Sequence, residues 1–258
     1  MVAGTGLDAE ASYYANWQNS DSIMDVTHLP VDIFDLLQAE SAFLGKVAYA
    51  EQFTAVVELG CHVGWGLLAA KILSLQYVGV DINRRAIGVL NKRISAECLT
   101  EGSVGLCGDL RSADTWSRIE SRVDLNNGAL AYLPFNFIGT TRDPVRILRH
   151  LATKGCSAAV ISAFNTTPMA IRVREQYYKN CGVRNVRFHR NRYGGTTFIG
   201  DGDFWSHSFS EEGLVNIVHE AGLLVEDIRT TELGIMLLVS VDITRLPPST
   251  MFSSTQVP

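Results

Sequence analysis

The stretch VVELGCHVGWG, residues 56–66, decides how the rest of the sequence is interpreted. Its apolar start is typical of a buried β-strand, Glu58 stands near the end of that strand, and three of its last seven residues are glycine. Glycine lets a ligand approach the backbone closely, and the N-terminus of a following helix attracts negative groups. A strand that leads through such a loop into a helix therefore predicts a nucleotide or nucleoside site at the edge of a sheet.

Short apolar segments alternate with helical patterns over most of the chain. Strands that are apolar on both faces and alternate with helices indicate a parallel sheet covered on both sides. The expected strands are residues 55–60, 77–82, 103–109, 129–136 and 156–164, and the expected helices between them are residues 64–75, 84–99 and 143–155. Two further strands, 223–230 and 235–243, are joined by a link too short for a parallel crossover. The last strand is therefore expected to run antiparallel to its neighbour.

The composition argues against several classes of partner. The formal net charge of −5 gives no general attraction to nucleic acid or anionic lipid. The five cysteines form no C-x-x-C pair, which is typical of a reducing cytosol. No window of about 18 uninterrupted apolar residues predicts a membrane span, and the first residues lack the pattern of a leader peptide. We expect a cytoplasmic protein without nucleic-acid or membrane partners.

The glycine loop does not fit two common phosphate-binding patterns. In G-x-G-x-x-G, counted from Gly60, the second and third glycine positions hold His62 and Trp65. A P-loop ends in Gly-Lys-Ser/Thr, and this loop has no lysine. Glu58 at the edge of the site would also repel a pyrophosphate. An acid in this place suits a ligand that carries a positive charge.

On these residues the chain resembles the class I S-adenosylmethionine-dependent methyltransferases. Their first motif reads E/D-x-G-x-G-x-G, and this chain has Glu58-Leu59-Gly60-Cys61-His62-Val63-Gly64, in which His62 replaces the usual middle glycine. Asp81 ends the next predicted strand, where a carboxylate can accept both ribose hydroxyls. Asp109 ends the third strand, where the family places the contact to the adenine amino group. The resemblance covers roughly residues 50–243.

The resemblance implies a fold and a cofactor. The fold would be α/β, a Rossmann-like seven-stranded sheet with a C-terminal antiparallel hairpin strand and helices on both faces. The cofactor would be S-adenosyl-L-methionine, which leaves as S-adenosyl-L-homocysteine. The residues implied to bind it are Glu58, Gly60, Cys61, His62, Gly64, Asp81, Ile82, Asp109, Leu110 and Pro134.

The end of the fourth strand, where the family places residues beside the reacting methyl group, reads LPFN. Asn136 in this run is the candidate for positioning the acceptor, and the absence of paired prolines argues against a flipped nucleic-acid base as acceptor. The run looks more like the small-molecule group that includes glycine N-methyltransferase-like enzymes. His207, in the aromatic segment DFWSHSFS, is the candidate general base.

The first helix and the segment 165–210 are expected to form the acceptor pocket. Tyr13, Tyr14 and Trp17 could close over the site, and Arg192 belongs to a basic cluster that could meet an acidic substrate group. The full set of expected acceptor-binding residues is Tyr13, Tyr14, Trp17, Phe135, Asn165, Arg192, Tyr193 and Trp205. The cysteines and histidines have no metal-ligand spacing, so no metal is expected.

The chain is thus divided into five parts. They are an N-terminal helical cap (1–50), an S-adenosylmethionine-binding core (51–164), an acceptor-binding insertion (165–210), a C-terminal helix and strands of the core (211–244) and a disordered tail (245–258). In the insertion, a helix over residues 168–182 is expected to lead into a hairpin or lid over residues 187–210.

The predicted function is transfer of a methyl group to a nitrogen or oxygen of a small molecule, in a biosynthetic tailoring pathway, by a possible homodimer. Two alternatives remain open. One is a methyltransferase-like protein that binds the cofactor without methyl transfer. The other is an oxidoreductase with NAD or NADP, against which the glycine spacing and the final antiparallel strand count.

Overall fold

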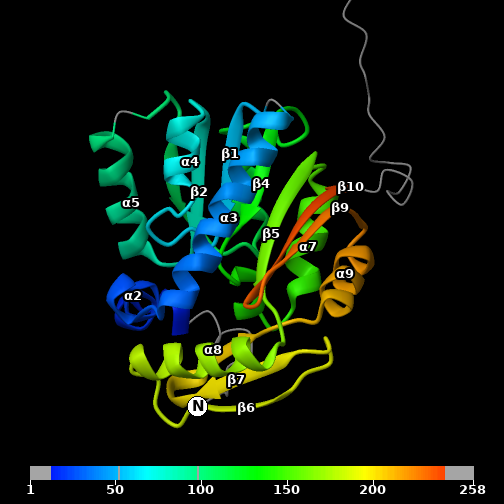
Figure 1. Ribbon diagram of the computed structural model, residues 1–258. Coiled ribbons are helices and arrows are strands. Elements are labelled where there is room, and N and C mark those ends of the chain that lie inside the picture. The colour runs from blue at the N-terminus through cyan, green and yellow to red at the C-terminus, as the bar shows by residue number, and fades with distance from the viewer. Residues whose placement is uncertain (1–12, 52, 98, 242–258) are drawn as a thin grey trace, which may run out of the picture.

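The computed structural model describes residues 13–51, 53–97 and 99–241, which form a seven-stranded sheet and a smaller three-stranded sheet (Figure 1). The order of the large sheet is β3-β2-β1-β4-β5-β10-β9. Its strands are β1 (Ala55–Leu59), β2 (Gln76–Asp81), β3 (Val104–Cys107), β4 (Ala129–Leu133), β5 (Ala158–Phe164), β9 (Leu223–Thr230) and β10 (Gly234–Val241). The first five strands are parallel, and β10 is antiparallel to both β5 and β9. The expected Rossmann-like sheet with its antiparallel C-terminal strand is confirmed.

Helices cover both faces of this sheet. They are α2 (Trp17–Met24), α3 (Val31–Ala50), α4 (Leu67–Ile72), α5 (Arg84–Ala96), α6 (Ala113–Glu120), α7 (Pro144–Thr153), α8 (Pro168–Asn180) and α9 (Glu211–Glu220), with short 3-10 helices at η1 (Val26–His28), η2 (Phe137–Thr140) and η3 (Asp201–Asp203). Val56 of β1 belongs to the hydrophobic cluster that contains residues of α3, α4 and α5, whereas its neighbour Val57 belongs to the cluster that contains residues of α6, α7 and α9. This alternation explains why the strand is apolar on both faces. Helix α6, which buries Trp116, was not expected from the sequence.

The segment that follows β5 begins with the predicted helix and continues as a three-stranded sheet in place of the predicted hairpin or lid. Helix α8 leads into three antiparallel strands, β6 (Arg187–Arg190), β7 (Thr196–Gly200) and β8 (Phe204–His207). All four residues of β6 are exposed, so the strand has no hydrophobic alternation to reveal it. Figure 1 shows α2, α8 and β7 together at one end of the large sheet. There they share a hydrophobic cluster with α3.

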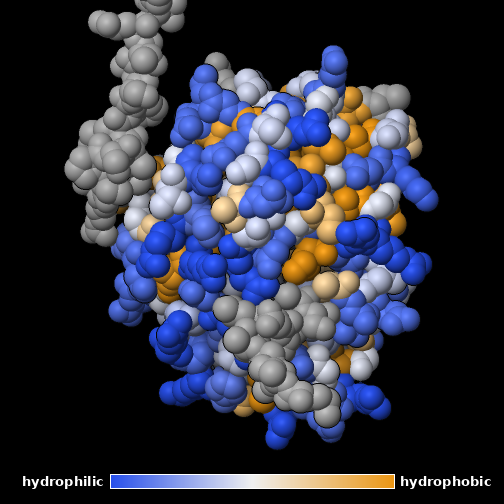
Figure 2. All heavy atoms as spheres, turned by 180° about the vertical axis from the view of Figure 1, so that it is seen from behind, coloured by the Kyte–Doolittle hydropathy of each residue, from blue (hydrophilic) through white to orange (hydrophobic). Residues whose placement is uncertain are grey.

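The outer surface is mainly polar. Seen from behind in Figure 2, polar side chains cover most of the surface and hydrophobic ones appear in separate patches, as is normal for folded proteins. Across the described ranges, no helix has the combination of length and apolar character needed to cross a bilayer. The expected tail, residues 245–258, and the first twelve residues of the expected cap lie outside the described residues.

The glycine loop after β1 is held by the carboxyl group of Glu58. Its Oε1 accepts the backbone N–H of Trp65 at 3.0 Å, and its Oε2 accepts the N–H of Gly66 at 2.9 Å and the hydroxyl of Tyr77. The side chain is fully buried. Burial raises the pKa of Glu58 to about 8, although the three donors act in the opposite direction. Glu58 therefore fixes the shape of the loop from inside the protein.

Glu58→Gln should change how the free energy of unfolding depends on pH. Because folding raises this pKa, the stabilisation by Glu58 is complete below about pH 4.3, the usual glutamate value, and is lost as pH rises towards 8. Glutamine does not titrate, so the fall in stability across this range should become shallower by up to about 1.4 kcal/mol per pH unit. Urea titrations at pH 5, 6, 7 and 8 measure the slope.

The free energy of unfolding of Glu58→Gln should also be about 1–3 kcal/mol lower than that of the wild-type protein at pH 5. The NH₂ group of glutamine replaces one acceptor oxygen by a donor, so one backbone N–H of the loop loses its hydrogen bond. Glu40 and Asp81 are further buried acids with raised pKa values, so the comparison between variants isolates Glu58. The exposed Glu101 provides the control, since Glu101→Gln should leave the slope unchanged. Equal slopes for Glu58→Gln and the wild-type protein would contradict the assignment.

Candidate functional site

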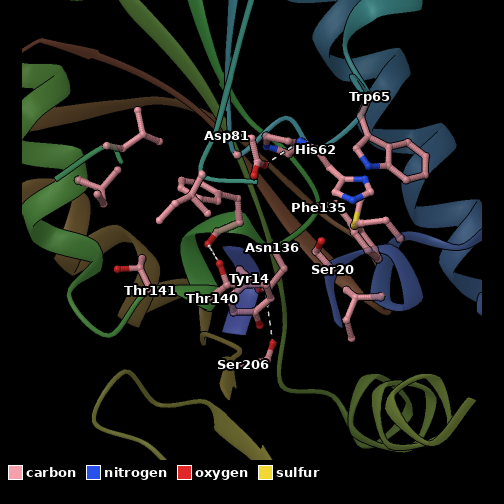
Figure 3. Close-up of a pocket in the computed structure, with 18 of the residues that line it drawn as sticks. Tyr14, Ser20, His62, Trp65, Asp81, Phe135, Asn136, Thr140, Thr141 and Ser206 are labelled. Atoms are coloured by element: carbon pink, nitrogen blue, oxygen red, sulfur yellow. Dashed lines mark hydrogen bonds between the residues drawn. The ribbon is translucent and has the colours of Figure 1, made fainter. Parts of the chain in front are cut away.

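A cavity opens where the parallel strands end. The loops after β1, β2, β3 and β4 form one side, and α2 with the segment 164–206 forms the other (Figure 3). Its empty volume is about 1130 Å³, open solvent at the mouth included. The lining residues are Tyr14, Ser20, Ile23, Met24, Gly60, His62, Trp65, Asp81, Ile82, Gly108, Asp109, Leu110, Arg111, Pro134, Phe135, Asn136, Phe137, Thr140, Thr141, Ile147, Phe164, Tyr177, Tyr178, Phe204 and Ser206.

Asp81 lies at the end of β2 and faces this cavity. Its Oδ2 accepts the N–H of His62 and its Oδ1 accepts the N–H of Asn83, both at 2.8 Å. Burial raises the pKa of Asp81, and these hydrogen bonds oppose the shift. Each carboxylate oxygen has a second lone pair. Asp81 can therefore accept two ligand hydroxyls while it still holds the loop.

Asp109, at the end of the third strand, is already paired with a cation. Arg111 Nε donates to Asp109 Oδ1 at 2.9 Å, and Arg111 Nη2 donates to Oδ2 at 2.6 Å. Partial burial raises the pKa of Asp109, but the hydrogen bonds and charge of Arg111 outweigh it, and the net pKa lies below the usual value. Both side chains line the cavity. This wall therefore carries an ion pair, which could not be predicted because Arg111 belongs to no recognisable sequence motif.

His62 occupies the position of the family's middle glycine with a positive φ of 46°. Its ring stacks on the Trp17 ring, with the two centroids 5.5 Å apart. The Arg85 guanidinium lies 4.8 Å from the centroid of the Trp17 ring. Neither ring nitrogen of His62 has a hydrogen-bond partner in the described part of the chain. Burial lowers the pKa of His62 to about 4, so the imidazole is neutral at physiological pH. The neutral ring therefore has one donor and one acceptor, both shielded from solvent and without a partner among the described residues.

Asn136 connects three strands at the acceptor side of the cavity. Its Oδ1 accepts the N–H of Phe164 at 3.0 Å, and its Nδ2 donates to Ser206 Oγ at 3.1 Å and to the carbonyl of His207 at 3.0 Å. Its φ of 59° places it in the left-handed region, which asparagine tolerates better than most residues. Asn136 lines the cavity, as expected, but its side chain is occupied in joining β4, β5 and β8.

His207 does not line the cavity. Successive residues of a strand point to opposite faces, so Ser206 faces the cavity and His207 faces the other way. The His207 Nδ1 lies 2.6 Å from Thr197 Oγ1 and 3.2 Å from Asn191 Nδ2. Burial and, to a smaller extent, nearby arginines lower its pKa to about 3. This placement argues against the expected role as general base.

The other expected residues divide between the cavity and its supports. Gly60, Ile82, Leu110, Pro134, Tyr14 and Phe135 line the cavity, whereas Cys61, Gly64, Tyr13, Trp17, Asn165, Arg192, Tyr193 and Trp205 do not. Trp17 supports His62 from outside, and Tyr13 packs in the cluster beneath β8. Asn165 donates to the carbonyl of Thr231, and Arg192 donates to the Tyr193 hydroxyl.

Sequence reasoning missed the aromatic wall contributed by the segment after β5. Phe164 and Tyr177 pack directly on Phe135, with ring centroids 5.5 Å and 5.9 Å from it. Tyr178 packs on Phe204 at 4.7 Å, and all five rings line the cavity. The Tyr177 hydroxyl donates to the carbonyl of Ile23, which joins α8 to α2. The adjacent tyrosines were the one available signal, because a helix that buries two large aromatic residues must pack on something.

No protein-family model matches the sequence, and no curated protein matches it either. Solved structures do resemble the fold. One is magnesium protoporphyrin IX methyltransferase from Synechocystis PCC 6803 with bound S-adenosylhomocysteine, which has a TM-score of 0.59 and 11% identity over 92% of this chain and 100% of that chain. Another is an S-adenosylmethionine-dependent methyltransferase from Clostridium acetobutylicum, with a TM-score of 0.53 and 12% identity over 91% and 98%.

A third structure is the (4+2)-cyclase SpnF, with a TM-score of 0.50 and 10% identity over 73% of this chain and 75% of that chain. At such identities the likeness concerns the fold. This likeness in fold agrees with two features of the present structure, the strand order β3-β2-β1-β4-β5-β10-β9 and the position of the cavity at the carboxyl ends of β1 to β4. The chain has the fold of the class I S-adenosylmethionine-dependent methyltransferases.

Proposed function

We propose that this protein is an S-adenosylmethionine-dependent methyltransferase that transfers the methyl group to a nitrogen or oxygen of a small molecule, as a biosynthetic tailoring enzyme. One observation carries the proposal. A single cavity joins the glycine loop and Asp81, which suit the cofactor, to an aromatic chamber beyond Asn136, which suits an apolar acceptor. The similar structures with S-adenosylmethionine or S-adenosylhomocysteine bound support the choice of cofactor.

The residues at the loop end fit this cofactor. Asp81 has free lone pairs for ribose hydroxyls, Ile82 and Leu110 offer apolar surface to the adenine ring, and His62 brings two unpartnered nitrogens in the described structure. The half-buried ring of Phe137 packs directly against Gly60, because a Cβ atom added to Gly60 would lie 2.1 Å from Phe137 Cδ2. A cofactor that lies along the loop therefore needs this ring to move aside.

The acceptor end favours a molecule that is already nucleophilic at neutral pH. When bound, S-adenosylmethionine supplies an electrophilic methyl group, so the protein has to position the acceptor and exclude water. The titratable residues that line this end within the described ranges are Tyr14, Tyr177 and Tyr178. Burial raises the pKa of Tyr177 well above the usual value, so it does not serve as a base near pH 7. An amine or a carboxylate needs no base here, whereas a neutral alcohol does.

Binding of the cofactor without methyl transfer is the second candidate. It is favoured by the Asn136 side chain, whose hydrogen bonds hold backbone groups and Ser206. The likeness to a (4+2)-cyclase adds support, because that protein is named for a cycloaddition. A nicotinamide cofactor has less support, since the antiparallel β10 beside β5 departs from the doubly wound dinucleotide sheet.

Asp81→Asn should weaken binding of S-adenosylhomocysteine about ten- to a hundred-fold, because hydrogen bonds to a charged group are lost. Isothermal titration calorimetry measures the affinity, and NAD serves as a ligand that should not bind. Asparagine retains one acceptor oxygen for the loop, and thermal unfolding checks that the variant folds. The control is Asp114→Asn at an exposed position of α6, which should bind like the wild-type protein. An unchanged affinity in Asp81→Asn would remove this residue from the cofactor site.

Methyl transfer is tested with methyl-labelled S-adenosylmethionine and a panel of small amines, phenols and carboxylic acids. We expect S-adenosylhomocysteine and a labelled product in equal amounts, and less of both with Asp81→Asn. Mass spectrometry identifies the product and the methylated atom. If the protein binds the cofactor tightly and labels no member of any class, the proposal of methyl transfer fails and the second candidate takes its place.

A further inference from the structure

The guanidinium of Arg174, in the middle of α8, is completely buried beside the acceptor chamber. Throughout residues 13–51, 53–97 and 99–241, no carboxylate forms an ion pair with it. It lies 4.7 Å from the Phe198 ring centroid, 4.9 Å from that of Phe164 and 5.6 Å from that of Tyr178. Aromatic faces stabilise a cation, but they leave its charge uncompensated. Buried charges are normally paired, so a missing counter-ion needs an explanation.

The hydrogen bonds of Arg174 lead to the cavity wall. Its Nε donates to the Tyr178 hydroxyl at 3.2 Å, and its Nη2 donates to Ser206 O at 3.0 Å and to Ser206 Oγ at 3.2 Å. Its Nη1 has no hydrogen-bond partner in the part of the chain that the structure describes. Tyr178 and Ser206 both line the cavity, and Figure 3 shows Ser206 beside Asn136. The positive charge therefore lies one hydrogen bond behind the hydroxyl groups of two residues of the cavity wall.

The corner of the cavity wall formed by Arg174, Tyr178 and Ser206 has more hydrogen-bond donors than acceptors. Ser206 Oγ lies within hydrogen-bond distance of Asn136 Nδ2 at 3.1 Å, Arg174 Nη2 at 3.2 Å and the Tyr178 hydroxyl at 2.7 Å. If Tyr178 donates to Ser206, the hydrogen of Ser206 has no acceptor among the described residues. If Ser206 donates to Tyr178, the hydrogen of Tyr178 has none. In either arrangement one hydroxyl hydrogen remains for a ligand.

We propose that the acceptor carries a carboxylate on an apolar, ring-bearing body, and that this carboxylate binds to the Tyr178–Ser206 hydroxyl pair in front of Arg174. An anion supplies the missing acceptor oxygens and the missing counter-charge together. The rings of Phe135 and Phe204 then face the apolar body of the acceptor. The inference rests on the proposed function and names its substrate class. Arg174 acts through the two hydroxyls and is a positioning residue.

The experiment compares matched pairs of neutral and anionic probes on the full-length protein saturated with S-adenosylhomocysteine. The pairs are benzoate with benzamide, 2-naphthoate with 2-naphthamide and indole-3-acetate with indole-3-acetamide. Calorimetry gives each affinity. At least one acid should bind ten-fold or more tightly than its amide, whose shape is nearly the same. A panel in which no acid exceeds its amide overturns the proposal.

Three variants assign any preference to this corner. Arg174→Met keeps the length of the side chain and removes its charge, while Tyr178→Phe and Ser206→Ala each remove one hydroxyl. All three should bring the ratio of acid to amide affinity close to one and leave the affinity for S-adenosylhomocysteine unchanged. The control is Arg172→Met, an exposed arginine of the same helix, which should keep the wild-type ratio. A full preference retained in Tyr178→Phe and Ser206→Ala contradicts the proposal even where Arg174→Met does not fold.

Two further results separate the possible failures. Binding of 2-naphthyl phosphate or 2-naphthalenesulfonate ten-fold more tightly than 2-naphthoate would replace the carboxylate by a tetrahedral anion, and so overturn the proposal. Binding of S-adenosylhomocysteine is measured separately. If it fails, the proposed function falls, and the probe pairs measured without it still decide the anion site. If it succeeds and no acid is preferred, the cofactor assignment stands and the carboxylate inference is wrong.

Discussion

The buried carboxyl group of Glu58 is the contact on which the rest of the site depends. It replaces water as the acceptor for the N–H groups of Trp65 and Gly66, which the tight loop leaves without backbone partners. With the loop fixed from inside, the backbone N–H of His62 reaches Asp81, and this bond adds to those that Gly60 and Cys61 donate to the carbonyl of Val80. An acid in this motif thus has a structural purpose that does not require contact with a ligand.

The acceptor side depends on polar links between distant segments. Asn83 Nδ2, at the start of α5, donates to Ser20 Oγ at 2.6 Å and attaches α2 to the core. Asn136 attaches β8 to the end of β4, and the Tyr177 hydroxyl attaches α8 to α2. Such bonds are directional, whereas the aromatic contacts around them are not. They therefore set the shape of the chamber, and the rings fill it.

The core and the cofactor side could be predicted from the sequence because their signals are local. A strand, its glycine loop and an acid at the next strand end follow each other in order, so Asp81 could be placed without coordinates. The residues around the acceptor depend on a strand register that sequence does not fix. A shift of one residue exchanges Ser206 for His207 at the cavity wall, so an aromatic segment alone does not show which of its residues faces a ligand. The hydrophobic periodicity of helix α6 and strand β6 was too weak to predict either element.

Arg174 shows why chemistry-bearing residues in an insertion are hard to interpret from sequence alone. In MAIRVREQYYKN it stands among other charged residues of an ordinary amphipathic helix, beside the exposed Arg172. Only the fold separates the two arginines, because it encloses one between Phe164 and Phe198 and leaves the other in water. A charge that folding places in an aromatic cage, without an acid in the described chain to match it, has an unfavourable desolvation that a ligand anion relieves. That energetic asymmetry, and not the residue type, points to the acceptor.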